Sequence, residues 1–437
     1  MEKYSEFINF TVKFIVNHKI FFVPKMLYER RLYSEIKPYL LDKETIVIHG
    51  ARQVGKTSLL KYIIQENHEI KDNHVFIDLE DIEYLQLCNK GVNSFIEYLT
   101  QKNLLKGKRL FVFIDEIQYL DNPSNFLKLL YDHYWEKIKL IVTGSSTFSI
   151  KSKFKNSLVG RTVNFELFPL SFQEFLAFKN INIRIDEKIK STIIINELKS
   201  YFSEFVKWGG YPAIVLETDY NKKKKKLSQI ISTYIKADIR DLGNIKNLTK
   251  FNNLLTIIAS QVGNLLNLSE LSNTIGLAKE TIENYLFILE NTYVIKLVRP
   301  FSRNLRTELT KMPKIYFEDT GIRNLLLNTG NEITGSVFEN AVFSELRKKI
   351  DINYINYWRT IKKHEIDFIL NLPGRLIPLE VKVSYQKRRY TSLVYFKNKY
   401  NIRKIYFCRL NDVNGNPYKW LKLIYPWDIY MEEFNEI

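Results

Sequence analysis

Short apolar runs alternate with helical segments between residues 45 and 142. Four runs have the length and the β-branched or aromatic content of strands, namely Thr45–His49, His74–Leu79, Leu110–Ile114 and Leu140–Val142. Helical segments lie between them, the first at Ser58–Gln65. Strands that are apolar throughout and are separated by helices predict an α/β fold whose parallel sheet is covered on both faces. The run His74–Leu79, which lies between the first strand and Leu110–Ile114 in sequence, suggests a sheet with an additional central strand.

The pattern changes after Ser171. Helical segments predominate up to Arg240, and the run Lys222–Lys226 is most simply a solvated helix face. Residues 251–320 predict a helix, a short helix, a helix and two strands. A helix from Gly335 to Leu346 then precedes strands at 353–358, 365–370 and 376–383. We therefore expect five parts: a helical lead-in over 1–40, a sheet core over 41–175, a helical part over 176–245, a helix-turn-helix part over 246–325 and a second α/β part over 326–437.

The composition is that of a globular protein. The chain has 437 residues, is 45% hydrophobic and 26% charged, and has room for about three domains of ordinary size. Its 2 cysteines, Cys88 and Cys408, exclude a disulfide scaffold and a CxxC zinc site. The start MEKYSEFINF lacks a signal-peptide layout, and no run approaches the roughly 20 apolar residues of a membrane span. We expect a soluble, cytoplasmic protein without a membrane partner.

The net charge of +17 points to an anionic partner such as DNA or another nucleic acid. An AT-rich coding sequence explains the excess of Lys, Ile and Asn equally well. The six histidines form no HExxH motif, and no GxSxG motif is present, so protease and esterase functions are poor hypotheses.

A phosphate-binding loop follows the first predicted strand. Residues 50–57, Gly-Ala-Arg-Gln-Val-Gly-Lys-Thr, fit GxxxxGK[ST] between a strand and a helix. Backbone N–H groups and the helix N-terminus attract phosphate oxygens there, Lys56 reaches the β- and γ-phosphates, and Thr57 ligates Mg²⁺. We expect ATP and Mg²⁺ as cofactors, and the nucleotide-binding residues are Gly50, Gln53, Val54, Gly55, Lys56, Thr57 and Ser58.

Two adjacent acidic residues end the strand at Leu110–Ile114. The carboxyl ends of parallel strands face the ligand crevice, so Asp115 is placed to hold Mg²⁺ through water. Its neighbour Glu116 is the candidate to orient or deprotonate the attacking water. Polar residues 143–146 end the next strand, and Ser145 is a candidate contact to the γ-phosphate or the lytic water. An ordinary turn is the alternative for these residues.

These motifs resemble those of prokaryotic AAA+-type P-loop ATPases related to the signal-transduction ATPases with numerous domains. The matching stretches are GARQVGKTS at 50–58, FIDEIQYL at 113–120, TGSS at 143–146, GRTVNFELFPLSFQEF at 160–175 and WGGYP at 208–212. The resemblance implies a helical lid over 176–245 that touches the nucleotide through Gly210 and Pro212. It also implies a phosphate-sensing role for Arg161. The alternatives are that Gly210 and Pro212 belong to an ordinary turn and that Arg161 has only a structural role. No arginine finger is evident, which leaves the oligomeric state open.

The segment 246–325 is similar to a winged helix-turn-helix. A turn at Gly276 joins two helices, and strands at 294–298 and 314–317 frame a wing. Six basic residues lie between Asn291 and Thr320, and they could contact DNA phosphates. The second helix has glutamates at 280, 283 and 290, which do not suit a DNA groove. The segment could equally pack on the lid and bind no DNA.

The last segment contains a second group of charged residues. Alternation along a strand puts Glu380 and Lys382 on one face, and a turn at Pro373-Gly374 returns the chain so that Asp367 lies alongside. Two carboxylates can bind Mg²⁺, and a lysine can orient a water for phosphodiester attack.

This arrangement resembles the PD-(D/E)xK nuclease superfamily, in which Glu339 matches a preceding acidic residue. The stretches GSVFENAVFSEL, HEIDFIL and IPLEVKVS also resemble a domain of unknown function that follows such ATPases. No proline directly precedes Asp367, where the superfamily often has one. Nine basic residues against one acid over 375–405, including Lys387, Arg388 and Arg389, favour nucleic acid as a partner.

The sequence favours an ATP-hydrolysing protein whose nucleotide state is coupled to a winged-helix and DNA-associated module with a degenerate or conditional nuclease-like domain. Two alternatives stay open. The chain could be an ATP-dependent switch that binds a protein partner and has an inactive nuclease fold. Alternatively, it is a Mg²⁺-dependent endonuclease used in defence. All three require ATP binding. They differ in whether Glu339, Asp367, Glu380 and Lys382 converge.

Overall fold

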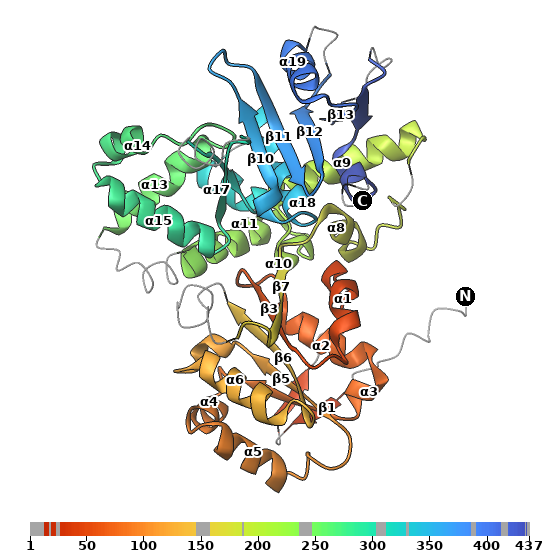
Figure 1. The fold of residues 1–437 in the computed structure, drawn as a ribbon, viewed down its shortest axis with the longest axis vertical. Helices are drawn as coiled ribbons and strands as arrows, with labels where there is room; N and C mark the ends of the chain where they lie inside the picture. Colours follow the sequence, from red (N-terminus) through yellow and green to blue (C-terminus); the bar gives the residue numbers. More distant parts are fainter. Residues whose placement is uncertain are drawn as a thin grey trace. The chain divides into compact units, whose positions relative to one another are not determined.

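Figure 1 shows the computed structural model of the chain. It describes residues 13–16, 19–22, 27–145, 158–185, 188–235, 247–302, 312–328, 332–385, 390–411, 418–432 and 434. Residues 1–48, 55–143 and 155–165 form a first compact unit. Residues 49–54, 144–154 and 166–437 form a second unit.

A five-stranded sheet with the order β4-β5-β6-β3-β7 is the framework of the first unit. Its strands are β3 (Thr45–Gly50), β4 (His74–Asp78), β5 (Leu110–Asp115), β6 (Ile138–Ser145) and β7 (Thr162–Leu167). The pairs β4–β5 and β5–β6 are parallel. Every residue of β5 and β6 is buried, as expected for strands covered on both faces.

The additional central strand is present, but it is not His74–Leu79. The strand between β3 and β5 is β6, whereas β4 lies at the edge of the sheet. The order of the strands in the sequence therefore differs from their order in the sheet. This is possible because parallel strands are joined by crossover connections, which can place the next strand at a position that is not adjacent.

Helices flank this sheet (Figure 1). They are α1 (Arg31–Ile36), η1 (Lys37–Tyr39), α2 (Lys56–Glu66), α3 (His68–Lys71), α4 (Ile82–Asn89), α5 (Val92–Gln101), η2 (Ile117–Tyr119) and α6 (Pro123–Tyr134). The lead-in is only partly helical. Strands β1 (Lys13–Val16) and β2 (Lys19–Phe22) form an antiparallel pair. Their sequences are rich in aromatic and β-branched residues, which favour strands.

The second unit begins with helices. They are α8 (Phe172–Phe178), α9 (Thr192–Trp208), α10 (Pro212–Val215), α11 (Tyr220–Gln229) and η4 (Ile230–Ile235). The lysine run in α11 is not entirely solvated, contrary to our expectation. Lys223 is buried, and its Nζ lies 2.8 Å from Glu204 Oε1 on α9. A lysine at this position is tolerated because a carboxylate neutralises it.

The helix-turn-helix elements follow. They are α13 (Leu248–Ser260), α14 (Leu268–Ile275), α15 (Lys279–Asn291), β8 (Ile295–Val298), β9 (Lys314–Phe317) and α17 (Thr320–Leu327). Gly276 ends α14 in the left-handed conformation that suits glycine. The strands β8 and β9 pair antiparallel. The predicted wing arginines Arg303 and Arg306 lie outside the described residues.

The C-terminal part is a second five-stranded sheet, with the order β10-β11-β12-β13-β14. Its elements are α18 (Gly335–Arg347), η5 (Ile352–Tyr354), β10 (Ile355–Arg359), β11 (Glu365–Leu372), β12 (Arg375–Lys382), α19 (Thr391–Tyr400), β13 (Ile405–Arg409), β14 (Leu421–Ile424) and η6 (Pro426–Tyr430). The turn after Leu372, which pairs with Arg375, contains Gly374 at φ 69°. This is the predicted Pro-Gly turn.

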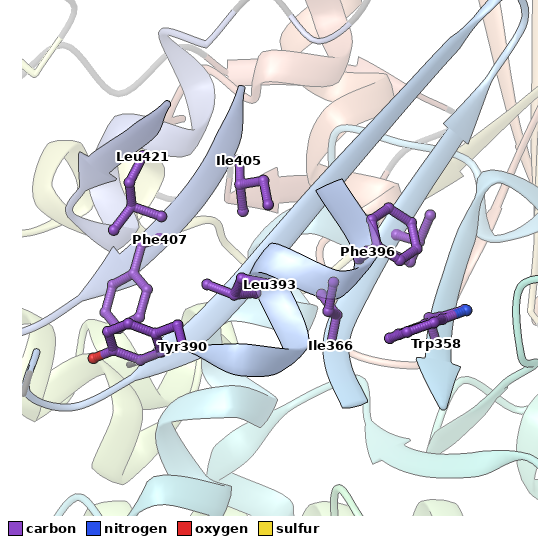
Figure 2. Packing of buried hydrophobic residues seen from close by; sticks show 9 residues of the cluster. Trp358, Ile366, Tyr390, Leu393, Phe396, Ile405, Phe407 and Leu421 are labelled. Atoms are coloured by element: carbon purple, nitrogen blue, oxygen red, sulfur yellow. The ribbon is translucent and has the colours of Figure 1, made fainter. Parts of the chain in front are cut away.

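Apolar side chains fix α19 on the C-terminal sheet. Figure 2 shows Leu393 and Phe396 of α19 packing against Ile366 of β11 and Ile405 of β13. The antiparallel pairing of β10 and β11 shifts its register between Asn356 and Trp358. Such an irregularity in a ladder changes the direction of nearby side chains, here in the stretch of β11 that contains Asp367.

No helix in the described part of the chain is both long enough and apolar enough to cross a membrane. Both cysteines are buried free thiols.

Candidate functional site

The predicted phosphate loop has the backbone conformation of a tight turn. Gln53 and Gly55 have positive φ angles of 61° and 99°, and α2 begins at Lys56 directly after Gly55. The Lys56 side chain is only 4% exposed. Its position in the first turn of α2, where the backbone N–H groups also attract anions, suits contact with phosphate.

Hydrogen bonds bring the predicted Mg²⁺ residues of the first unit together. Thr57 Oγ1 donates to Asp115 Oδ2 over 2.6 Å, although the two residues are 58 positions apart. The Thr143 hydroxyl donates to the other carboxylate oxygen of Asp115. Burial raises the pKa of Asp115, while the bonds from Thr143 and Thr57 oppose that rise. The carboxylate is held in a fixed position between two strands and the phosphate loop.

The backbone conformation of Glu116 and a hydrogen bond from a glutamine set the orientation of its side chain. Its φ of 56° turns the chain out of β5, and its N–H donates to Thr143 Oγ1 over 3.1 Å. Gln118 Nε2 donates to the Glu116 carboxylate. Lys56 Nζ lies 4.0 Å from Glu116 Oε1. The candidate base and the candidate phosphate ligand are therefore neighbours.

Sequence reasoning missed two residues of this site, Gln118 and Arg30. Thr143 was one of the polar residues 143–146 considered as contacts to the γ-phosphate or the lytic water, but its bond to Asp115 was not foreseen, and neither was the bond from Gln118 to Glu116. Arg30 is a buried arginine, and its Nη1 lies 3.7 Å from the point where a Cβ on Gly55 would be. Only the FIDEIQ motif could have indicated Gln118, because the other two contacts join distant parts of the chain.

Arg161 and the lid residues have defined partners. Arg161 Nε donates to Asp132 Oδ1 on α6 over 2.6 Å, so a phosphate-sensing role would require this ion pair to open. The Gly210 N–H donates to Asp319 Oδ2 over 2.7 Å, and a Cβ on Gly210 would lie 2.3 Å from Leu170 O. Close packing thus accounts for this glycine. Nucleotide contacts by Gly210, Pro212 and Ser145, which all belong to the second unit, stay predictions.

The C-terminal charged residues converge. Lys382 Nζ lies 2.7 Å from Asp367 Oδ2 and 2.8 Å from Glu380 Oε1. The Val381 N–H donates to Asp367 Oδ2 over 2.8 Å, next to the end of the β11–β12 ladder. Strand alternation and the Pro-Gly turn predicted this adjacency. We call Asp367, Glu380, Lys382 and Glu339 the carboxylate cluster.

Residues of β9 complete the cluster. Tyr316 donates its hydroxyl to Glu339 Oε1 over 2.6 Å. Lys314 Nζ lies 3.3 Å from the same oxygen and 2.7 Å from Glu365 Oε1. Lys314 is only 2% exposed. It was counted among the basic residues that could contact DNA from the wing, and that expectation was wrong for this residue, because buried carboxylates require its charge.

The pKa values of this group reflect burial and mutual repulsion. Burial and the nearby Asp367 raise the pKa of Glu380 to about 8 and that of Glu339 to about 7. Burial alone would lower the pKa of Lys382, but Asp367 and Glu380 raise it by more. A group of carboxylates that resists full ionisation has a high affinity for positive charge.

The donor set fits a hard cation. Mg²⁺ takes carboxylate oxygens, and Glu380 Oε2 is buried without a hydrogen-bond partner among the described residues. In the arrangement observed, the Lys382 ammonium neutralises Asp367 and Glu380. No group of three or more His, Cys, Asp or Glu side chains within the described ranges is arranged to hold a metal by itself. The predicted basic residues Lys387, Arg388 and Arg389 lie outside those ranges.

Family models match three consecutive segments of the chain. Residues 42–176 match an AAA domain. Residues 199–332 and 334–417 match two domains of unknown function, DUF8612 and DUF4143.

The chain is also similar to whole proteins. It is 32% identical over 342 residues to the uncharacterized protein MJ1544 of Methanocaldococcus jannaschii, covering 77% of this chain and 74% of that protein. An uncharacterized protein of Haemophilus influenzae is 25% identical over 390 residues, covering 86% and 92%. The solved structure of the Aeropyrum pernix ORC1 protein in complex with DNA covers 70% of this chain and 94% of its own at 10% identity. Its TM-score of 0.35 is too low to support an argument.

The motif at 50–57, the position of Asp115 at the end of β5 and the AAA-domain match agree with one another. The chain belongs to the protein family of Methanocaldococcus jannaschii MJ1544, and its first sheet is that of a P-loop AAA-type ATPase domain.

Proposed function

We propose that the chain binds and hydrolyses ATP with Mg²⁺ at the first unit. The observation that supports this most directly is the hydrogen-bonded group of Thr57, Asp115 and Thr143 beside Lys56 and Glu116. Thr57 and Asp115 would hold Mg²⁺, which when bound draws negative charge from the phosphate oxygens. Lys56 neutralises the β- and γ-phosphates, and Glu116 orients the attacking water and accepts its proton.

Two variants test this proposal. Lys56→Ala should abolish tight ATP binding, because the phosphates lose a buried positive charge. Glu116→Gln should bind ATP as the wild type does and hydrolyse it at least a hundredfold more slowly, roughly the contribution of a general base. Equal turnover by Glu116→Gln and wild type would refute the role of Glu116. ATP binding is measured by titration calorimetry, and phosphate release gives the turnover.

We propose as a second function that the C-terminal part cleaves phosphodiester bonds. The convergence of Asp367, Glu380 and Lys382, together with the unpaired oxygen of Glu380, supports it. Asp367 and Glu380 would hold Mg²⁺, which when bound polarises a phosphodiester oxygen. Lys382 then orients a water molecule, and Glu339 adds negative charge to the cluster.

Plasmid cleavage by the full chain tests this second function. The wild type should nick supercoiled DNA in Mg²⁺ and not in EDTA, and Asp367→Ala should be inactive. The matched control is Asp351→Ala, which removes an exposed aspartate from the same domain. Cleavage by Asp367→Ala at the wild-type rate would refute the assignment. No cleavage by any form would favour the retained nuclease fold of a regulatory switch.

The two functions would be coupled if the nucleotide state controls the DNA-associated module. The basic residues near the winged-helix segment and over 375–405 support nucleic acid as the partner, and the alternative is a protein partner. DNA affinity measured for Glu116→Gln with ATP and for Lys56→Ala separates these possibilities. Equal DNA affinity in both variants would argue against coupling.

A further inference from the structure

Three aromatic rings form a stack at one end of the C-terminal sheet. The rings of His364 and Tyr395 lie 4.9 Å apart and are inclined by 7°, and Tyr395 stacks on Trp358 at 6.0 Å and 27°. Trp358 is 3% exposed, whereas Tyr395 is 45% exposed. Tyr395 is therefore the middle ring of the stack, the buried Trp358 is one end, and the half-buried His364 is the other.

The scaffold holds these rings in place. Trp358 lies in β10, His364 directly precedes β11, and Tyr395 is on α19, which Leu393 and Phe396 anchor to the sheet (Figure 2). Ser392 Oγ lies 3.4 Å from His364 Nδ1 and accepts the Glu365 N–H over 3.3 Å. Because both sides of the stack are fixed, a flat ligand can add to it without a large ordering cost.

The charge around the stack is positive. Lys362 and Lys363 are exposed at the β10–β11 turn, and Lys399 Nζ lies 5.9 Å from the centre of the Tyr395 ring. The sequence of α19, TSLVYFKNKY, contains no acidic residue. Exposed aromatic rings between lysines are what proteins use to bind single-stranded nucleic acid, where bases stack on rings and lysines contact phosphates.

We propose that His364 and Tyr395 form a stacking platform for an unpaired base of single-stranded nucleic acid. His364 precedes Asp367 by three residues, roughly 10 Å along a strand, and side chains three apart face opposite sides, so the platform lies near the carboxylate cluster on the α19 side of the sheet. This inference deepens the proposed nuclease function and rests on it for its meaning: the strand that reaches the cluster has at least one unpaired base. Because Tyr395 already stacks on Trp358 and on His364, the base would stack on the outer face of His364, which the Tyr395 ring supports from behind.

Fluorescence anisotropy with the full chain tests the platform. The probes are a fluorescein-labelled oligo(dT) and a blunt duplex of equal length, both in EDTA without nucleotide. Tyr395→Ala should bind oligo(dT) roughly tenfold more weakly, because His364 loses the ring that holds it in place for stacking on a base, and should change duplex binding little. Tyr395→Phe keeps the ring and should bind as the wild type does. Tyr354→Ala is the matched control, since Tyr354 is 39% exposed at the opposite end of β10 and should have no effect.

An oligonucleotide with abasic residues separates stacking from a general structural effect. It should bind wild type and Tyr395→Ala equally, because it has no base to stack. The double variant Lys362→Ala/Lys363→Ala should reduce the salt dependence of binding, which Tyr395→Ala should leave unchanged.

Unchanged oligo(dT) affinity in both Tyr395→Ala and His364→Ala would overturn the proposal, as would an equal loss for the abasic strand. Because EDTA and the absence of ATP prevent cleavage and hydrolysis, these results do not depend on either activity. A chain that binds oligo(dT) through Tyr395 but never cleaves DNA would contradict only the nuclease proposal.

Discussion

Glu166 and Arg347 form an ion pair that joins the AAA-domain segment to the last matched segment of the chain. Glu166 lies in β7, and Arg347 is the last residue of α18. Arg347 Nε also lies 3.6 Å from the buried Glu318 Oε1. Burial alone would raise the pKa of Glu166, but Arg347 lowers it below its ordinary value. One guanidinium thus compensates two carboxylates.

Arg347→Met should destabilise the second unit by about 3–5 kcal/mol, the usual cost of leaving a buried carboxylate without its partner. Guanidinium unfolding at neutral pH measures this loss. Adding Glu318→Gln should recover part of it, because one uncompensated charge is removed. If Arg347→Met and wild type unfold at the same denaturant concentration, the pair contributes nothing to stability.

Gln118→Leu should slow ATP hydrolysis about tenfold and leave ATP affinity unchanged. Gln118 donates to Glu116 and holds its carboxylate in position. A misplaced general base slows the chemical step but does not weaken the binding of ATP in the ground state. Steady-state turnover and titration calorimetry measure the two quantities. The matched control is Gln101→Leu, which removes a similar bond to the exposed Glu97. Identical kcat values for Gln118→Leu and wild type would show that Gln118 does not position the base.

The sequence predicted those site residues that local rules connect. The phosphate loop follows from a motif, and Glu380 and Lys382 share a face because side chains alternate along a strand. Asp367 was placed beside them by the Pro-Gly turn that joins β11 and β12. Asp115 was found because the end of a buried parallel strand faces a ligand. Each of these inferences needs only neighbouring elements.

The remaining features depend on tertiary contacts. Lys314 resembled a basic wing residue, and only the packing of β9 against α18 gives it Glu339 as a partner. The position of β6 between β3 and β5 results from a crossover that no local pattern specifies. Lys223, in a run of five lysines, differs from its neighbours only because Glu204 lies opposite.

Glu380→Gln should flatten the pH dependence of stability in metal-free protein. The pKa of Glu380 is raised to about 8, mainly by burial, so between its ordinary value and pH 8 the folded chain binds a proton that the unfolded chain releases. The free energy of unfolding of the wild type should therefore fall as pH rises through this range, by up to about 1.4 kcal/mol per pH unit. Gln cannot titrate and removes this contribution.

Denaturant unfolding in EDTA between pH 5 and 8 measures both slopes. Glu270→Gln, which changes an exposed glutamate on α14, should keep the wild-type slope. Equal slopes for Glu380→Gln and wild type would mean that Glu380 is ionised in the folded protein throughout this range.

Lys314→Met should destabilise the metal-free chain and increase its response to Mg²⁺. Burial and Asp367 raise the pKa of Glu339, and Lys314 opposes that rise and pairs with Glu365, so its removal leaves the carboxylate cluster with one positive charge fewer. The expected loss is about 3–5 kcal/mol, as for other broken buried pairs. A cation that binds only the folded state raises stability, and a more negative cluster binds it more tightly.

Thermal unfolding in EDTA and in MgCl₂ checks both parts of this prediction. The Mg²⁺-induced rise in Tm should be larger for Lys314→Met than for wild type, whereas Lys279→Met, on the exposed start of α15, should behave as wild type in both solutions. Wild-type stability of Lys314→Met in EDTA would show that its ion pairs are not needed for the fold. A lower Tm with no additional effect of Mg²⁺ would instead show that Lys314 stabilises the fold but that the cluster does not bind a cation. In that case, removing the ammonium group that competes with Mg²⁺ would not have created a binding site.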